Sequence, residues 1–236
     1  MLKNRRNLKF ADIQEKDSAK VSVDGIDTLT KDTVKEKLAL LTLQKQLQLL
    51  KLREYLLLIS FVVAGALGRV LMQALPSVEP LTFFAMLSGW LFGKRKGFLV
   101  GASSLYLSNF FVFGGQGPWT LAQALGFGIA GFAGGFLRKK AKMIECLTIT
   151  VIATLTFEII LNVSSLVFIP TGIFMAFLLG LPFLLAHVVS NGIFSLLLPK
   201  IKSYIEKTGH FNEKDIYLKL MNKLRWRINK KIKNEA

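Results

Sequence analysis

The chain consists of long apolar blocks separated by short polar connections. Each block is nearly free of charged residues and is bounded by Pro, Gly or a cluster of Lys and Arg. Apolar blocks of this kind are typical of helices that cross a membrane. The pattern therefore predicts an all-α membrane protein with a bundle of six transmembrane helices, over residues 55–75, 81–93, 97–114, 119–137, 144–168 and 173–199.

The second block is shorter than the others. A straight helix needs about 20 residues to cross the hydrocarbon core of a bilayer, and residues 81–93 fall short of that length. We expect this span to be partial, tilted or sheltered by neighbouring helices, because unpaired backbone groups are not tolerated in lipid.

The basic residues alternate from one connection to the next. They lie before the first block, between the second and third, between the fourth and fifth, and after the sixth. The other three connections, residues 76–80, 115–118 and 169–172, contain no Lys or Arg. Since Lys and Arg near span ends stay on the cytoplasmic side, this alternation predicts six spans with both termini in the cytoplasm of a cell membrane.

Charge and hydropathy divide the chain into three parts. Lys and Arg number 31 against 15 Asp and Glu, which gives a formal net charge of +16, yet the mean hydropathy is +0.44. Residues 54–199 carry eight basic and four acidic side chains, a net +4, so the remaining +12 lies in the tails. We therefore predict a cytoplasmic N-terminal tail (1–53), a membrane domain (54–199) and a basic C-terminal tail (200–236).

Basic residues that flank apolar blocks, instead of lining one face, argue against nucleic acid as a partner.

Both tails contain helical patterns. Leu40, Leu43, Leu47 and Leu50 recur every three or four residues, which predicts a partly helical N-terminal tail. Near the other end, a second apolar face alternates with basic residues, at Tyr217, Leu220, Met221, Leu224 and Ile228. This amphipathic stretch suits the surface of an anionic bilayer, and a solvated tail that only enforces topology is the alternative.

Signatures of catalysis are missing from the sequence. The segment GWLFGKR at 89–95 has too few residues between its glycines, and no Ser or Thr after its lysine, for a phosphate-binding loop. No aspartate occurs between Asp32 and Asp215, and neither HExxH nor GxSxG is present. Cys146 is the single cysteine, and His187 and His210 are the only histidines. We therefore expect no enzymatic activity, no cofactor and no metal site.

Polar side chains inside the spans are the best candidates for a site, because each is costly in hydrocarbon and is expected to face the bundle interior or a cavity. Under the predicted orientation most of them lie at mid-depth or toward the outside. The predicted substrate-binding residues are Arg69, Asn109, Gln116, Trp119, Gln123, Glu158 and Asn162. The structural alternative is that Glu158 pairs with Arg69, or bonds as a neutral acid, and merely closes the bundle. For His187 and Asn191, nearer the inner half, hydrogen bonding between helices is the favoured interpretation.

The second outer connection has an unusual composition. Residues 114–120 read GGQGPWT. Three glycines permit close approach of the backbone to a ligand, Pro118 stiffens the turn, and Trp119 offers a flat stacking surface. A plain turn needs no indole, and an interfacial position is the alternative for Trp119.

Small residues recur every fourth position in the first span, at Ser60, Ala64 and Gly68. Such a stripe lets another helix approach closely. Internal packing explains it equally well as docking of a separate membrane subunit, and we predict the latter for these three residues.

Taken together, these motifs resemble the substrate-binding S component of an energy-coupling factor (ECF) vitamin importer over about residues 55–200. The resemblance lies in the order and spacing of Gly68-Arg69, Pro76, Glu79-Pro80, Gly89, Phe92-Gly93, Gly97-Phe98, Gly101, Ser108-Asn109-Phe110, Gly114, Gly117-Pro118-Trp119-Thr120, Gln123, Gly131, Gly134, His187, Asn191 and Phe194. Gly68 stands where the family often has the second alanine of an Ala-x-x-x-Ala pattern, and the long tails also depart from the family pattern.

The resemblance implies a function. In that family a six-helix bundle binds one vitamin in its outer half and associates, through small residues of its first helix, with a transmembrane coupling subunit and two ATPases. The expected partners are thus those subunits, the vitamin and the lipid bilayer. The Gly-Pro-Trp-Thr loop resembles S components linked to cobalamin uptake, so a cobalamin-like cargo is expected, with riboflavin or another flat heterocyclic vitamin as the alternative. Alternatives of another class are a membrane enzyme that uses Glu158 and His187 as acid and base, and an autonomous channel or carrier.

Overall fold

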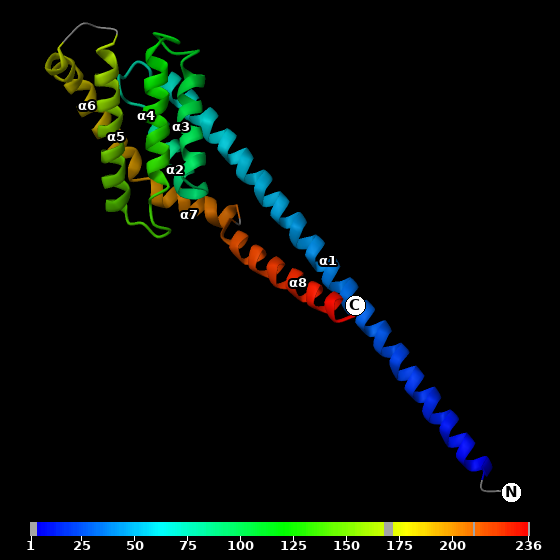
Figure 1. The fold of residues 1–236 in the computed structure, drawn as a ribbon. Helices are drawn as coiled ribbons and strands as arrows, with labels where there is room; N and C mark the ends of the chain where they lie inside the picture. The colour runs from blue at the N-terminus through cyan, green and yellow to red at the C-terminus, as the bar shows by residue number, and fades with distance from the viewer. Residues whose placement is uncertain (1–3, 168–171, 210, 236) are drawn as a thin grey trace. The chain divides into compact units, whose positions relative to one another are not determined.

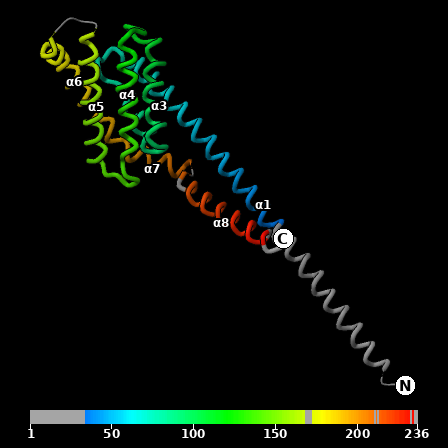
Figure 2. Tube along the Cα trace, in the orientation of Figure 1, coloured from blue at the N-terminus to red at the C-terminus, as the bar shows by residue number. Residues whose placement is uncertain are grey.

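Every regular element in the described part of the chain is a helix. The structure is a computed structural model that describes the backbone of residues 4–167, 172–209 and 211–235, and the side chains of 34–167, 172–209, 211, 213–231 and 233. The helices, shown in Figure 1 and Figure 2, are α1 (Asn4–Met72), α2 (Leu81–Phe92), α3 (Lys94–Ser108), α4 (Trp119–Gly134), α5 (Met143–Ser165), α6 (Ile173–Ser195), α7 (Leu198–Thr208), the short 3₁₀ helix η1 (Phe211–Glu213) and α8 (Lys214–Glu235). The chain divides into two compact units, residues 1–50 with 212–236 and residues 51–211.

A helix occurs at each of the six predicted spans. In the described residues three helical segments are long and apolar enough to cross a membrane, Val34–Met72, Met143–Ser165 and Ile173–Ser195. The surface also exposes large apolar side chains, such as Leu71 at 83% and Leu121 at 77%. Extensive apolar exposure of this kind marks a surface that faces lipid. The chain is thus an all-helical membrane protein.

Pro and Gly set the boundaries between the bundle helices. Pro80 precedes α2, Pro118 precedes α4, and Gly93 separates α2 from α3 with a φ of 96°. Only glycine adopts this φ without strain, so the chain turns there at little cost. The predicted third span was too long, because α3 ends at Ser108 and not at residue 114.

Helix α2 lies inside the bundle, as predicted for the short second span. Nine of its 12 residues are buried, and it packs against α3, α4, α6 and α7. Phe83, Met86, Leu87 and Trp90 of α2 belong to the main apolar core. A 12-residue helix is only about 18 Å long, so the neighbouring helices cover the backbone ends that it leaves within the bilayer.

Glycines bring α2, α3 and α4 into direct backbone contact. A Cβ atom on Gly89 of α2 or on Gly97 of α3 would clash with the carbonyl oxygen of Gly131 on α4. A Cβ on Gly131 would clash in turn with the carbonyl oxygen of Gly97. The three helices can approach this closely only because these positions carry no side chain.

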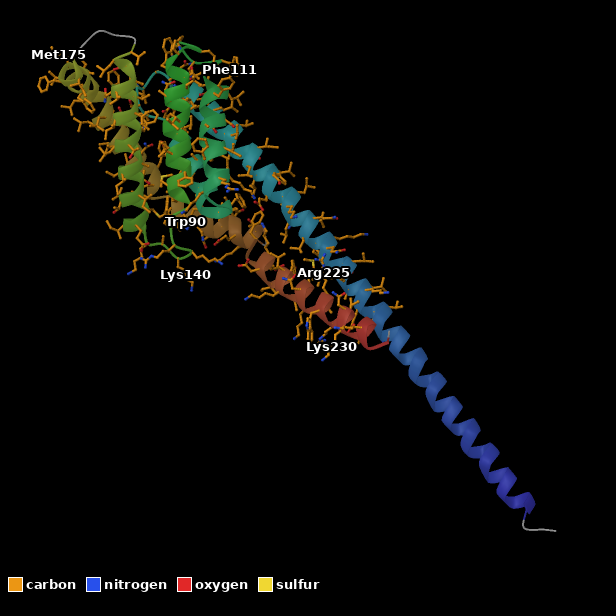
Figure 3. The ribbon with its side chains drawn as sticks, in the orientation of Figure 1. Trp90, Phe111, Lys140, Met175, Arg225 and Lys230 are labelled. Carbon is orange, nitrogen blue, oxygen red and sulfur yellow. The ribbon has the colours of Figure 1, made fainter. Side chains whose placement is uncertain are left out.

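The connections separate into two ends of the bundle unit. Figure 3 shows Phe111, in the α3–α4 connection, and Met175, at the start of α6, at one end, and Lys140, in the α4–α5 connection, at the other. The α1–α2 connection lies at the same end as Phe111 (Figure 1). Most of the predicted connection 169–172 lies outside the described residues. The α1–α2 and α3–α4 connections, which contain no basic residue, thus lie at the same end of the bundle.

Helix α7 is part of the bundle unit, which extends to Phe211 and so beyond the predicted boundary at residue 199. The Lys202 side chain is buried, donates a hydrogen bond to the carbonyl oxygen of Lys139 at 2.9 Å, and pairs with Glu206 at 2.8 Å. Its Nζ also lies 4.9 Å from the centroid of the Trp90 ring. These contacts hold α7 against the end of the bundle that carries the basic connections.

The second unit combines the N-terminal part of α1 with α8. The predicted leucine stripe is its most buried face, with Leu47 at 8% and Leu50 at 4% exposure, and Ile228 of α8 is 7% exposed. Lys231 pairs with Glu36 at 3.2 Å. The unit thus buries part of the two predicted apolar faces, most fully at Leu47, Leu50 and Ile228, while Leu220 of the C-terminal face is 45% exposed.

Candidate functional site

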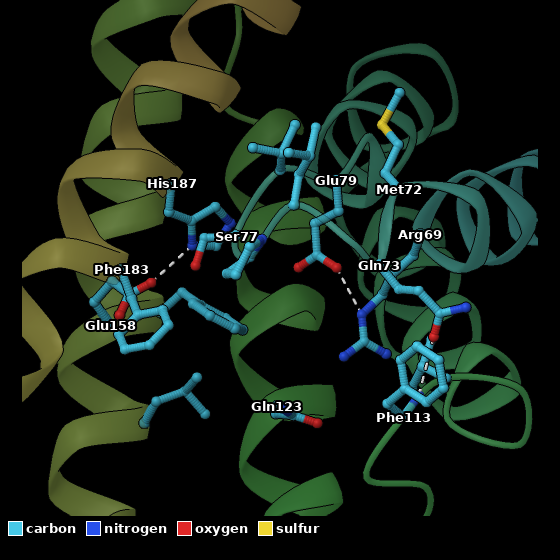
Figure 4. A pocket seen from close by; sticks show the side chains of 16 residues that line it. Arg69, Met72, Gln73, Ser77, Glu79, Phe113, Gln123, Glu158, Phe183 and His187 are labelled. Carbon is cyan, nitrogen blue, oxygen red and sulfur yellow. Dashed lines mark hydrogen bonds and ion pairs between the residues drawn. The ribbon is translucent and has the colours of Figure 1, made fainter.

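A cavity of about 280 Å³ opens at the end of the bundle that carries the α1–α2 and α3–α4 connections. Four helices and both connections line it (Figure 4). The lining residues are Arg69, Met72, Gln73, Leu75, Pro76, Ser77, Val78, Glu79, Val112, Phe113, Gln123, Phe157, Glu158, Leu161, Phe183 and His187. Polar and charged groups of helices far apart in the sequence thus share one hollow.

Arg69 forms one side of the cavity. Its Nε lies 2.6 Å from Glu79 Oε2, while Nη1 donates to Ser108 Oγ at 2.8 Å and to Asn109 Oδ1 at 2.5 Å. The Arg69 and Glu79 side chains are 16% and 13% exposed. A charge this far from water needs partners, and the planar guanidinium group supplies donors in fixed directions. Arg69 therefore ties α1 to the start of α2 and to the end of α3.

Asn109 links this ion pair to α4. Its amide nitrogen donates to Thr120 Oγ1 at 3.0 Å and to Gln123 Oε1 at 3.2 Å, and the side chain is 1% exposed. Because Gln123 Oε1 accepts from Asn109, the Gln123 amide nitrogen is oriented away from that bond. Asn109 does not line the cavity, but it positions two residues that do.

Glu158 and His187 form the other side of the cavity (Figure 4). Glu158 Oε1 lies 2.8 Å from His187 Nδ1, and both side chains are buried. The structural alternative that Glu158 pairs with Arg69 is therefore wrong, because Arg69 is engaged by Glu79. The expected hydrogen bonding between helices is confirmed for His187, and also for Asn191, which donates to Thr154 Oγ1 of α5 at 2.9 Å and to Thr82 Oγ1 of α2 at 3.3 Å.

The predicted substrate-binding residues separate into two groups. Arg69, Gln123 and Glu158 line the cavity, and Asn109 supports it. Gln116, Trp119 and Asn162 are not among the lining residues. Gln116 donates to the carbonyl oxygen of Tyr106 at 2.8 Å on the surface, and Asn162 packs against Gly180 of α6.

The GGQGPWT connection has a structural explanation. Gly114 and Gly115 have positive φ values of 91° and 57°, and a Cβ on Gly117 would clash with the Trp119 ring. Trp119 is 41% exposed. The glycines thus satisfy the turn and make room for the indole, instead of opening the backbone to the cavity.

Four polar residues that line the cavity were not predicted as binding residues. They are Gln73, Ser77, Glu79 and His187. His187 was predicted to form a hydrogen bond between helices in the inner half, because depth along a span does not reveal which cavity a side chain reaches. The signal in the sequence for Glu79 is an acidic residue directly before Pro80, in a connection without basic residues.

The three residues predicted to contact another subunit differ in exposure. Ser60 is exposed, and its hydroxyl group donates to the carbonyl oxygen of Leu56 at 2.8 Å, while Ala64 is half-buried. A Cβ on Gly68 would clash with the Pro80 ring, so Gly68 serves packing within the chain. Ser60 therefore remains open to a partner and Ala64 partly so.

The described residues contain no group of three or more His, Cys, Asp or Glu side chains that could hold a metal ion. The arrangement instead offers two hydrogen-bonded pairs on facing sides of a hollow, Arg69 with Glu79 and His187 with Glu158. Such a hollow can hold a small polar molecule, because it combines an apolar wall with a few oriented polar groups.

Fold and cavity together define the class: an all-helical membrane protein with a polar cavity at one end of its bundle. The chain belongs to the family of unknown function DUF6580, which matches residues 50–210. The matched range covers the bundle unit and the cavity. Neither a curated protein nor a solved structure matches the chain.

Proposed function

We propose that this chain is the substrate-binding S component of an energy-coupling factor vitamin importer. It crosses the membrane six times with both termini in the cytoplasm, captures its ligand from the outside and catalyses no reaction. The observation that carries the proposal is that Arg69, Gln123 and Glu158, three costly polar residues from different helices, line one cavity.

The distribution of basic residues supports the orientation. Lys94 to Lys96 form the first turn of α3 and Arg138 to Lys142 lie in the α4–α5 connection, both expected on the cytoplasmic side, while the α1–α2 and α3–α4 connections at the cavity carry no basic residue. The cavity then opens to the outside, where a nutrient is captured.

The energy for release comes from partners. A coupling subunit binds the exposed face of α1 around Ser60 and Ala64, where Leu56, Ile59 and Val63 are also exposed. Two ATPases bound to that subunit supply the differential free energy that changes the exposure and affinity of the cavity.

The cavity favours a small cargo. Its volume of about 280 Å³ lies at the lower edge of the roughly 300–1,000 Å³ typical of small-molecule sites. The expectation of a cobalamin-like cargo depended on the Gly-Pro-Trp-Thr sequence at 117–120. None of these four residues lines the cavity. We therefore propose that the cargo is a small heterocyclic vitamin and not a corrinoid.

Purification of the full chain with its retained ligand, followed by absorbance and mass spectrometry, tests the receptor function. Gln123→Leu removes a polar group from the cavity and is expected to weaken binding of the retained vitamin about threefold to tenfold, the effect of one neutral hydrogen bond. Gln116→Leu is the matched control, because Gln116 lies outside the cavity. A wild-type protein that retains and binds no vitamin contradicts the proposal.

A second candidate is a membrane enzyme, which is favoured by the 2.8 Å contact between Glu158 and His187. A carboxylate that orients an imidazole is a common acid and base arrangement. This candidate predicts turnover of a bound compound that Glu158→Gln abolishes. The receptor instead predicts that the bound vitamin is recovered chemically unchanged.

A further inference from the structure

His187 is held in a fixed orientation at the cavity wall. Its Nδ1 contacts Glu158 Oε1 at 2.8 Å, and its ring lies edge-on to Phe157 with a centroid distance of 5.0 Å. The side chain is 2% exposed. Neither ring nitrogen can therefore turn to a new partner without breaking the contact with Glu158.

The second ring nitrogen is unsatisfied. Within the described chain, His187 Nε2 is buried and has no hydrogen-bond partner. An orphaned buried N–H is rarer than an orphaned acceptor, which favours the tautomer in which Nδ1–H donates to the Glu158 carboxylate and Nε2 carries a lone pair. Since His187 lines the cavity, a hydrogen-bond donor of a ligand that reaches this nitrogen would satisfy it.

The charges at the cavity wall do not cancel. Among its described lining residues, Arg69 contributes one positive charge and Glu79 and Glu158 contribute two negative charges, so with a neutral His187 the formal sum is −1. Arg69 and Glu79 neutralise each other at 2.6 Å. The excess negative charge therefore lies at Glu158, which contacts Nδ1 of the same imidazole ring, and burial makes an uncompensated carboxylate costly.

We infer that the ligand of this cavity is a small organic cation with an N–H or O–H donor, which donates to His187 Nε2 while its positive charge lies against Glu158. This inference rests on the receptor function and specifies its substrate class. Glu158 acts both as counter-ion and as the positioning residue of His187.

Isothermal titration calorimetry on the purified full chain tests the inference with three probes, thiamine as a cation, riboflavin as a neutral heterocycle and biotin as an anion. We expect thiamine to bind most tightly. Glu158→Gln is expected to weaken thiamine binding about 10- to 100-fold, the effect of losing a hydrogen-bonded charge, and to change riboflavin binding little. Glu145→Gln is the matched control, because it is the same change on α5 outside the cavity.

Two further variants separate the role of Nε2 from simple packing. His187→Gln keeps a side-chain acceptor and is expected to retain more thiamine binding than His187→Leu, which keeps none. Tighter binding of riboflavin or biotin than of thiamine, or thiamine binding that is unaffected by Glu158→Gln, overturns the inference and leaves the receptor function intact. If none of the three probes binds, the inference is also overturned. The receptor function is overturned as well only if the purified protein in addition retains no vitamin.

Discussion

At the scale of single residues, Arg69 organises the polar end of the bundle. Its guanidinium group contacts Glu79, Ser108 and Asn109, which belong to the α1–α2 connection, to α3 and to the residue that follows α3. A buried ion pair of this kind adds little net stability, but removal of one partner leaves the other charge buried and unpaired.

The change Arg69→Met is therefore expected to lower the free energy of unfolding by about 1.5–3 kcal/mol or more, since that is the range for one hydrogen bond to a charged group. The measurement is the free energy of unfolding of the purified protein in detergent. Arg69→Met combined with Glu79→Leu should recover part of the loss, because the second change removes the orphaned carboxylate. Additive losses in the double variant would show that the two side chains do not interact.

At the scale of elements, the contacts of α2, α3 and α4 depend on glycine. Gly89, Gly97 and Gly131 bring three backbones within contact distance. The resulting tight packing supports the residues at the helix ends, including Asn109 after α3 and Gln123 in α4, which shape the cavity.

The change Gly131→Ala is expected to lower the free energy of unfolding by about 1–3 kcal/mol, because the new methyl group overpacks the contact with the Gly97 carbonyl oxygen. Thermal unfolding followed by tryptophan fluorescence measures the effect. Gly192→Ala on α6 is the control, since the nearest side-chain atom to its Cβ, Leu147 Cδ1, lies at 3.6 Å. Equal effects of the two changes would contradict a specific role for the glycine contact.

At the scale of the whole molecule, the placement of basic residues agrees with the orientation that the proposed receptor function requires. The cavity lies at the end whose described connections lack basic residues, while Lys139, Lys202 and Arg138 lie at the other end. A receptor that captures a nutrient requires this arrangement, because the binding side must face the source of the ligand.

Cysteine labelling in cells tests the orientation. In a Cys146→Ala background, Gln116→Cys is expected to react with a membrane-impermeant maleimide in intact cells, since Gln116 lies in an exposed connection predicted outside. Lys140→Cys should react only after the membrane is permeabilised. Labelling of Lys140→Cys in intact cells would reverse the proposed topology.

The helices and their order could be read from the sequence. Pro80 and Pro118 predict helix starts, and Gly93 a helix end, that the structure reproduces closely, because backbone constraints at Pro and Gly are local. The sheltered position of α2 was one of the three outcomes that its length predicted, since too few apolar residues cannot span a bilayer. The sequence likewise identified the costly polar residues Arg69 and Glu158 as site candidates.

Only the tertiary structure decided which of these residues meet. Glu158 pairs with His187 and not with Arg69. Glu79 lines the cavity, and Trp119 does not. These outcomes depend on the rotation of each helix about its axis and on its distance from its neighbours. Hydropathy and spacing specify which face of a helix is apolar, but the partner of a polar side chain is set by close packing between segments far apart in the chain.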